Sequence, residues 1–339
     1  MHKTINLSLS DIFELSVDAL LASGANRENA EAVSAVVRNA DRDGCTSHGI
    51  FRVPGYCSAL KLGAVNGHAK PELIDQAPSI VRIEASNGLA PLAVEVGRPS
   101  LIKKAKDQGI ATLAIRNSAH FAALWPDTEP LADDGLVAMS FVNSRAFVAP
   151  AGGKRRRVFG TNPMSFAVPR SGQPPMVFDQ ASSAAARGEI MLAARDGHKA
   201  LAEWGLGPDG VETDDPAEIL KGVQLPFGGY KGGAIALMVE ILAALLTGGE
   251  TSLEAERSYT GHGGPSPAGH LIIAMDPKRF GQENFINRVE LLFEEMLADP
   301  EVRLPGDRRL AMRQKTQTQG VDIPETLFQE VREISRGPK

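Results

Sequence analysis

Short apolar runs constrain the fold of this chain more than any other feature. Ala111–Ile115 and Val137–Val142 are bounded runs of the length and composition typical of buried strands. Ser165–Val168, which ends at Pro169, and Leu271–Met275 have the same character. These four runs predict strands that belong to the core of the protein.

Helical patterns lie around these runs. Ser10–Gly24 and Asn26–Ala40 have apolar residues at helical spacing, and Asn26 is a suitable N-cap. Asn87-Gly88 predicts a turn followed by a helix to about residue 108, and a later helix is predicted over Gln282–Leu297. Strands and helices mixed throughout the chain predict an α/β or α+β fold.

Composition limits the function classes. The chain of 339 residues can bury a large core, and its net charge of -5 is no signature of nucleic-acid binding. The basic run Lys154–Arg157 predicts a solvated turn, with a grip on a phosphate as the alternative. Cys45 and Cys57 make no disulfide framework, the N-terminus lacks a signal pattern, and Ala234–Leu246 is too short to span a bilayer. We therefore expect a cytoplasmic protein without a membrane partner, in which Ala234–Leu246 is a buried helix.

The segment Asp43–Tyr56 carries the most chemistry. It places the hydroxyl of Ser47, the imidazole of His48 and the guanidinium of Arg52 within six positions. If a helix resumes at Ser47, the side chains of His48 and Arg52 share one face. A proton donor beside an arginine suits a small 2-oxo or 2-imino acid. Taken alone, the pattern fits better a helix-start serine with two surface side chains.

Four further segments resemble parts of one site. Asn117–Pro126 follows a predicted strand, where α/β proteins bind ligands, although a loop with a buried histidine is the alternative. Gly160–Pro163 is a polar turn before a strand. Leu225–Gly233 places glycines and Lys231 at the start of an apolar helix, which suits a phosphate or tight packing equally. Arg303–Arg309 is a surface loop or a clamp on phosphates.

Three common motifs are absent from the sequence. No Gly-x-Gly-x-x-Gly follows a predicted strand, so the Rossmann fingerprint is missing. No Gly-x-x-x-x-Gly-Lys-Ser/Thr is present, which excludes a P-loop enzyme. The seven histidines include no His-x-x-x-His pair, so we predict no metal site.

Six short motifs nevertheless occur in a specific order. They are Ser-His-Gly-x-x-Arg-x-Pro-x-Tyr, Asn-Ser-x-His-Phe, Gly-Thr-Asn-Pro, Phe-Asp-x-Ala-Ser-Ser, Leu-Pro-x-Gly-Gly-x-Lys-Gly and a late Pro-Gly turn. In this order they resemble the type-2 malate/L-lactate dehydrogenase family of NAD(P)-dependent oxidoreductases, from about Leu9 to Arg309. The resemblance implies a non-Rossmann fold with a large mixed, mainly antiparallel sheet flanked by helices.

Two details resemble the branch of that family that reduces cyclic imines, the Δ1-piperideine-2-carboxylate/Δ1-pyrroline-2-carboxylate reductases. His120–Asp127 lacks the Gly-x-x-Gly-Tyr-Tyr run expected in members that reduce 2-oxo acids. Arg187-Gly188-Glu189 carries an acid where many relatives carry lysine. The imine reductases normally have aspartate there, so Glu189 is a departure, and Asp179 competes with it as the carboxylate partner of His48.

The resemblance implies a role for each matching residue. Ser47, His48 and Glu189 would form a proton relay, and Arg52, Thr161 and Arg187 would hold the substrate. The implied cofactor-binding residues are His120, Phe121, Ala122, Ala123, Leu124, Phe178, Asp179, Gln180, Tyr230, Lys231, Arg303, Leu304, Pro305, Gly306, Asp307, Arg308 and Arg309. Because basic residues are frequent near this site, we expect NADPH, with NADH as a weaker alternative.

The implied reaction is hydride transfer to the C=N carbon of a five- or six-membered cyclic imino acid, which yields L-proline or L-pipecolate. Arg52 would bind the ring carboxylate and His48, tuned by its acid partner, would exchange the proton. A 2-oxo acid or 2-hydroxy acid substrate, such as those of malate, lactate, ureidoglycolate or diketogulonate dehydrogenases, is the alternative within the family. An inactive cofactor-binding protein is the remote alternative.

The resemblance also implies an organisation of the chain. Residues 1–60 would form an N-terminal helical segment with the Ser-His pair, residues 61–117 plus 297–339 a scaffold domain, and residues 118–296 the NADPH-binding domain. Family likeness and the apolar patterns on the first two helices predict a homodimer.

Overall fold

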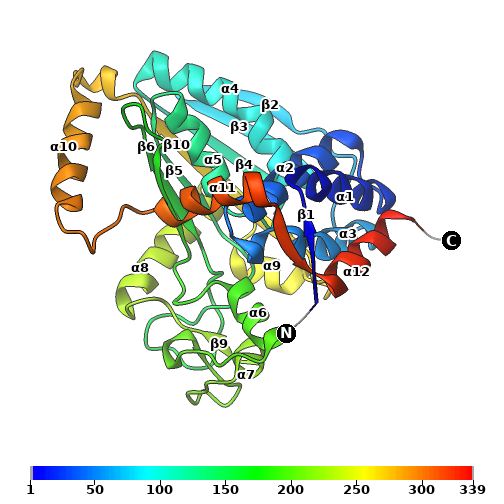
Figure 1. The fold of residues 1–339 in the computed structure, drawn as a ribbon. Helices are drawn as coiled ribbons and strands as arrows, with labels where there is room; N and C mark the ends of the chain where they lie inside the picture. Colours follow the sequence, from blue (N-terminus) through cyan, green and yellow to red (C-terminus); the bar gives the residue numbers. More distant parts are fainter. Residues whose placement is uncertain (1–2, 338–339) are drawn as a thin grey trace.

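A computed structural model describes residues 3–337 of the chain (Figure 1). Its centre is a seven-stranded sheet in the order β2-β3-β4-β10-β5-β6-β7. The strands are β2 (Glu72–Ala77), β3 (Ile80–Leu89), β4 (Ile110–His120), β5 (Val137–Val142), β6 (Met164–Val168), β7 (Met176–Gln180) and β10 (Ser266–Met275). Only β3 and β4 pair in parallel. The predicted mainly antiparallel sheet is confirmed, and so are its four predicted strands.

Helices and two small strand pairs surround the sheet. The pairs are β1 (Thr4–Leu7) with β11 (Val321–Pro324), and β8 (Gly205–Leu206) with β9 (Val223–Gln224). The α-helices are α1 (Leu9–Ala22), α2 (Arg27–Arg42), α3 (Val53–Lys61), α4 (Ala90–Gln108), α5 (Trp125–Asp133), α6 (Arg187–Asp196), α7 (Pro216–Lys221), α8 (Tyr230–Val239), α9 (Ser252–Ser258), α10 (Phe285–Leu297), α11 (Asp307–Gln319) and α12 (Glu325–Ser335). The pairing of β1 with β11 places an N-terminal strand beside a strand of the C-terminal part of the chain (Figure 1).

The first two helices pack inside the protein. Ser8 and Asp11 form a capping box at the start of α1, and Asn26 caps α2 as predicted. Their apolar faces join one core cluster with α3 and α12, in which Ile12 and Val33 are almost fully buried. Because the chain itself covers these faces, the sequence argument that assigned them to a dimer interface is wrong.

The apolar stretch Ala234–Leu246 divides into the end of α8 and a π-helical turn, Glu240–Leu245. One side of it is buried against the sheet, but Leu237 and Leu246 are 49% and 67% exposed. The prediction of a fully buried helix is therefore wrong for the other side. The inner side is tied down by the buried Glu240 carboxylate, which accepts hydrogen bonds from Asn162 and from Ser252.

Two sequence boundaries fall inside strands. The strand β3 continues through Asn87-Gly88, where Ser86 and Asn87 have positive φ and the register with β4 shifts. The turn signal there marks an irregularity in a strand rather than a turn. The predicted domain boundary at residue 117 lies within β4, which pairs with β10 along the middle of the sheet. The division into domains stays a prediction.

Candidate active site

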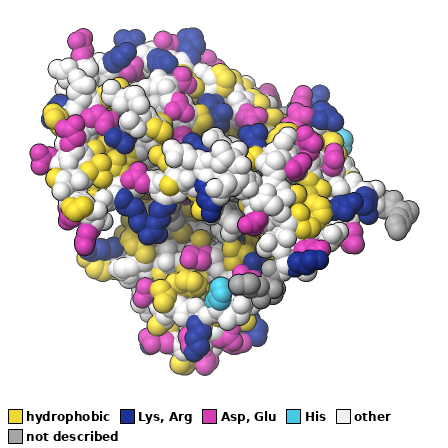
Figure 2. All heavy atoms as spheres, in the orientation of Figure 1, with side chains coloured by type: hydrophobic (Ala, Val, Ile, Leu, Met, Phe, Trp, Pro, Cys, Tyr) yellow, Lys and Arg dark blue, Asp and Glu magenta, His cyan; other side chains and the backbone are white. Residues whose placement is uncertain are grey.

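A cavity of about 700 Å³, here called the main cavity, brings together segments that are far apart in the sequence. Its size is within the usual range for small-molecule sites. The predicted site residues that line it are Ser47, His48, Arg52, His120, Phe121, Ala122, Ala123, Leu124, Thr161, Phe178, Asp179, Gln180, Arg187, Glu189, Gly306 and Arg309. Figure 2 shows a hollow between the sheet-bearing part and the lower part of the molecule, with basic side chains at its edge.

Seven residues predicted to contact a cofactor lie outside this lining. They are Tyr230, Lys231, Arg303, Leu304, Pro305, Asp307 and Arg308. Tyr230 is 73% exposed at the start of α8, whereas Leu304 is buried in a cluster with Phe293. The basic run Lys154–Arg157 is not part of the lining either, although Arg157 donates hydrogen bonds to backbone carbonyls at residues 220–222, of which Leu220 lines the cavity. The cofactor roles of these residues stay predictions.

The Ser47-His48 pair lies on a 3-10 turn, Thr46–His48, which is followed by a second one, Ile50–Arg52. The expected α-helix begins only at Val53, so the predicted shared helix face of His48 and Arg52 is wrong. The Asp41 carboxylate fixes the junction of the two turns by accepting a 2.7 Å hydrogen bond from the Ile50 amide. Gly49 is required at this junction because a Cβ would overlap that carboxylate.

His48 is held as a neutral imidazole. Its Nδ1 lies 3.0 Å from the Ser47 hydroxyl oxygen. Burial lowers the pKa of His48 to about 3, and the positive charge of Arg52 acts in the same direction. Across the described residues, the Glu189 carboxylate makes no hydrogen bond or ion pair, so the expected acid partner does not contact His48. The tuning of the His48 pKa by an acid partner stays a prediction.

Arg52 is a buried cation that has no acidic side chain as its partner. It is 5% exposed, its Nε has no hydrogen-bond partner, and it forms no ion pair with any residue that the structure describes. Its guanidinium lies 4.1 Å from the centroid of the Phe121 ring, and burial lowers its pKa to about 10. A buried charge without a counterion is costly. The arginine is therefore prepared for an anionic group that a ligand brings.

A second guanidinium lines the cavity near Phe147. The Arg187 guanidinium lies 4.1 Å from the centroid of that ring, and its pKa is lowered to about 9 by burial and by the neighbouring arginines. Arg145, which the sequence analysis missed, lies 3.4 Å from the centroid of the Tyr259 ring and 3.6 Å from the Glu256 carboxylate. Arg145 closely follows the end of β5, and that position could have identified it.

Asp179 shapes the loop that follows β4. Its carboxylate accepts hydrogen bonds from the amides of Leu124 at 2.7 Å and Trp125 at 3.1 Å. Burial raises the pKa of Asp179 to about 6, and the two amides oppose that increase. Asp179 therefore orients the lining of the cavity and makes no contact with His48.

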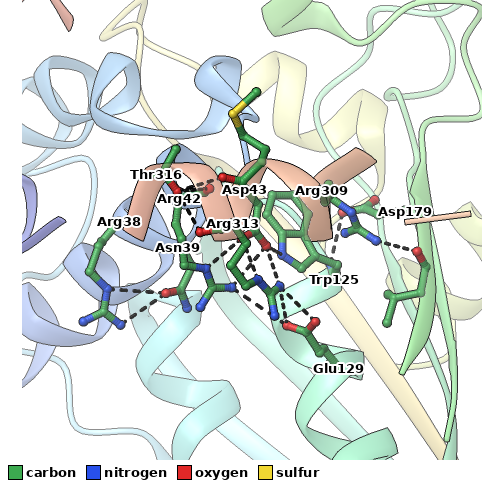
Figure 3. Close-up of polar contacts among 12 residues, drawn as sticks. Arg38, Asn39, Arg42, Asp43, Trp125, Glu129, Asp179, Arg309, Arg313 and Thr316 are labelled. Carbon is green, nitrogen blue, oxygen red and sulfur yellow. Dashed lines mark hydrogen bonds and ion pairs between the residues drawn. The ribbon is translucent and has the colours of Figure 1, made fainter. Parts of the chain in front are cut away.

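Arg309 reaches the same wall from α11 (Figure 3). It donates a hydrogen bond to the Val177 carbonyl, and its guanidinium lies 4.9 Å from the centroid of the Trp125 ring. Its Nη1 is buried and has no hydrogen-bond partner. A partly unsatisfied guanidinium at the edge of a large cavity fits the phosphates of a dinucleotide.

A buried polar network lies behind His120. His270 Nε2 lies 2.8 Å from the Ser140 hydroxyl and 3.4 Å from the Asp127 carboxylate, and the His120 ring meets the His270 ring edge-on. The ligand atoms of His120, Asp127 and His270 lie within 4.8 Å of one another. These residues come from β4, α5 and β10, so the spacing of histidines in the sequence gave no sign of the cluster.

Comparison with known proteins agrees with this geometry. A Δ1-pyrroline-2-carboxylate reductase of Ancylobacter novellus is 43% identical over 100% of this chain and 99% of its own length. A Pseudomonas putida Δ1-pyrroline-2-carboxylate/Δ1-piperideine-2-carboxylate reductase is 46% identical over 90% of both chains. The crystal structure of Δ1-piperideine-2-carboxylate reductase from Pseudomonas syringae pv. tomato superposes with a TM-score of 0.93 at 42% identity, covering 98% of this chain and all of that one.

More distant relatives act on other substrates. A (2R)-3-sulfolactate dehydrogenase (NADP+) of Chromohalobacter salexigens is 38% identical over 96% of this chain and 97% of its own length. The malate dehydrogenase of Entamoeba histolytica superposes with a TM-score of 0.91 at 27% identity, covering 99% of both chains. The family described as malate/L-lactate dehydrogenase matches residues 7–332. The chain therefore belongs to the malate/L-lactate dehydrogenase family of oxidoreductases.

Proposed function

We propose that the protein reduces the C=N bond of a cyclic imino acid, Δ1-pyrroline-2-carboxylate or Δ1-piperideine-2-carboxylate, to L-proline or L-pipecolate with NADPH. The observation that carries the proposal is the buried Arg52 without an acid partner, in the same cavity as the Ser47-His48 pair. The names of the most similar relatives support the same substrate class.

The reduced nicotinamide cofactor supplies the hydride when it is bound. The Arg52 guanidinium binds the ring carboxylate through two parallel hydrogen bonds and orients the ring. The ring nitrogen must carry a proton for the C=N carbon to accept hydride. A neutral His48 accepts a hydrogen bond from that N–H through the nitrogen that does not face Ser47, and it adds no positive charge beside the cationic ring.

The remaining polar groups stabilise the charge of the substrate, enclose it or support the cavity wall. Glu189 lines the cavity with an unpartnered carboxylate, which stabilises the cationic ring by its charge. Thr161 and Arg187 line the same cavity and help to enclose the substrate. Because Asp179 is engaged by two backbone amides, it holds the loop after β4, and Glu189 is the carboxylate that acts on the ring.

Membership of the family implies a nicotinamide cofactor, and we propose NADPH in preference to NADH. We also propose a homodimer in the cytoplasm. The apolar surface that supports dimerisation is the outer side of α8 and its π-helical continuation, where Leu237, Ile241, Leu245 and Leu246 are exposed. No helix of residues 3–337 is long and apolar enough to cross a membrane.

A second candidate is a dehydrogenase of 2-hydroxy acids. It is favoured by the sulfolactate dehydrogenase at 38% identity and by the arginines of the cavity, which match the carboxylate of a 2-oxo acid equally well. The experiment is NADPH oxidation, followed by ultraviolet absorbance, with both cyclic imines and with pyruvate, oxaloacetate and sulfopyruvate. Faster turnover of an imine is expected. Higher kcat/KM for any of the 2-oxo acids would overturn the proposal.

A further inference from the structure

A second cavity of about 320 Å³, here called the outer cavity, lies behind the substrate end of the main cavity. Both cavities are lined by Arg52, Phe121, Met191 and Gly263. These four residues therefore form the partition between them. Of the four, Arg52 is the buried cation for which the protein provides no acid.

The partition is thin and partly made of backbone. The Arg52 guanidinium lies over the Phe121 ring, 4.1 Å from its centroid. Gly263 belongs to the loop between α9 and β10 and has a φ of +71°. Its amide donates a 2.6 Å hydrogen bond to the Tyr259 hydroxyl, and a Cβ on Gly55 of α3 would lie 2.8 Å from its carbonyl oxygen. Glycine at both positions keeps bulky side chains out of the space beside Arg52.

The charges of the outer cavity match a small zwitterion. Its outer rim carries the exposed carboxylate of Glu330 on α12, and its inner end carries the guanidinium of Arg52. Phe51, Pro54 and Leu327 provide apolar wall between these charges. A protonated cyclic imino acid has one positive charge, one carboxylate and a ring of CH₂ groups, so each part has a counterpart.

The outer cavity adjoins the main cavity at Arg52. Of the cavity-lining residues that we assign to the dinucleotide, Phe121 also lines the outer cavity, where its ring lies against Arg52, whereas Asp179, Gly306 and Arg309 line the main cavity and not the outer one. A dinucleotide that occupies the main cavity covers the approach to Arg52 from that side. A substrate that binds after the cofactor then needs another route.

We propose that the outer cavity is the passage through which the cyclic imino acid reaches Arg52 while the dinucleotide is bound. This inference rests on the proposed function. Substrate and product exchange between α3, α12 and the loop before β10, and the dinucleotide does not have to leave in each cycle.

The test compares binding rates rather than affinities, because narrowing a passage slows association and dissociation together. The probe is pyrrole-2-carboxylate, a planar ring carboxylate without a C=N bond to reduce. The filled variant is the double substitution Ser58→Phe/Glu330→Phe, which places a phenyl ring into the outer cavity from α3 and another from α12. The control, Lys61→Phe/Gln329→Phe, places the same side chains on the same helices at exposed positions that line neither cavity. Stopped-flow fluorescence follows the probe in the free and the NADPH-loaded protein.

In the loaded protein we expect both rate constants to fall at least about tenfold in the filled variant, with Kd unchanged. The free protein and the control variant should keep wild-type rates. Wild-type rates in the loaded filled variant, or a changed Kd with an unchanged dissociation rate, would overturn the passage. If the double variant does not fold, the same rate constants are measured in the single variant Glu330→Phe, whose substitution is at an exposed site. A wild-type protein that reduces no cyclic imine overturns the proposed function itself, whereas normal turnover with unchanged rates removes only the passage.

Discussion

Arg313 and Asp43 form a bidentate ion pair that joins the helix α11 to the end of α2 (Figure 3). Arg313 Nε and Nη2 lie 2.9 and 2.7 Å from the two carboxylate oxygens. The buried Asp43 also accepts a 3.0 Å hydrogen bond from the indole of Trp125, and it lies four residues before Ser47. One carboxylate thus connects the segment of the Ser-His pair, the loop after β4 and the helix that carries Arg309.

The first prediction concerns this ion pair. In Arg313→Met the buried Asp43 carboxylate loses its strongest partner but keeps Arg42. The free energy of unfolding should fall by about 3 kcal/mol, at the low end of the range for breaking a buried pair. Urea denaturation measures it, with the exposed Arg308→Met on the same helix as the control. Equal stability of the two variants would show that the pair is merely a surface contact.

The second prediction concerns the carboxylate of the substrate. Arg52→Lys replaces a flat guanidinium by a point charge, so it should cost about 1.5–3 kcal/mol of substrate binding. That loss corresponds to a KM for the imine roughly 10- to 150-fold higher. Steady-state kinetics with saturating NADPH measure it, and the Kd of NADPH should stay the same. A wild-type KM in this variant would contradict the role of Arg52.

The third prediction concerns His48. His48→Ala removes the acceptor for the ring N–H, and turnover should fall roughly 10²- to 10³-fold, the usual effect of losing one preorganised hydrogen-bonding group. NADPH binding and the circular dichroism spectrum should stay those of the wild type. Full turnover in a folded variant would assign the proton chemistry to another group.

The fourth prediction uses pH. Burial raises the pKa of Asp41 to about 7, well above its value in an unfolded chain. The folded state therefore holds the proton to higher pH, and the free energy of unfolding should decrease as pH rises from about 4 to about 7. Asp41→Asn keeps an oxygen for the Ile50 amide but cannot ionise. Relative to its stability at pH 4.5, the variant should gain about 3 kcal/mol over the wild type by pH 7.5.

Chemical denaturation at several pH values gives this difference directly. The Asp179 carboxyl, whose pKa is also raised, contributes in both proteins and cancels in the comparison. Parallel pH profiles for the two proteins would show that Asp41 stays ionised in the folded state.

The sequence predicted the elements that carry their own apolar pattern. β4, β5, β6 and β10 were identified because each has a continuous apolar run. The strands β2 and β11 were missed, since edge strands with mixed exposure have no such run. The partners of Glu240 and the outer side of α8 depend on what the rest of the chain places beside them, and local sequence does not contain that information.

In the candidate site, too, some features could be predicted from the sequence and others depend on the folded chain. Motif order placed Ser47, Arg52 and Arg187 in one cavity although nothing in their spacing requires it. The neutral state of His48 could not be predicted, because it results from burial and from the charge of Arg52. The cluster of His120 and His270 comes from two strands that pair only in the folded chain.

The last prediction concerns the preference for NADPH. Arg309 lines the main cavity, whereas Arg308 is exposed beside it. Arg309→Gln should weaken both NADPH and NADH at least about tenfold, because an arginine at the cavity wall contacts phosphates that the two cofactors share. Arg308→Gln should weaken NADPH alone if Arg308 binds the 2′-phosphate, which carries nearly two negative charges. Fluorescence titration of each variant with both cofactors separates these roles. Equal Kd values for NADPH and NADH in the wild type would remove the proposed preference, and an unchanged ratio in Arg308→Gln would exclude Arg308 as its source.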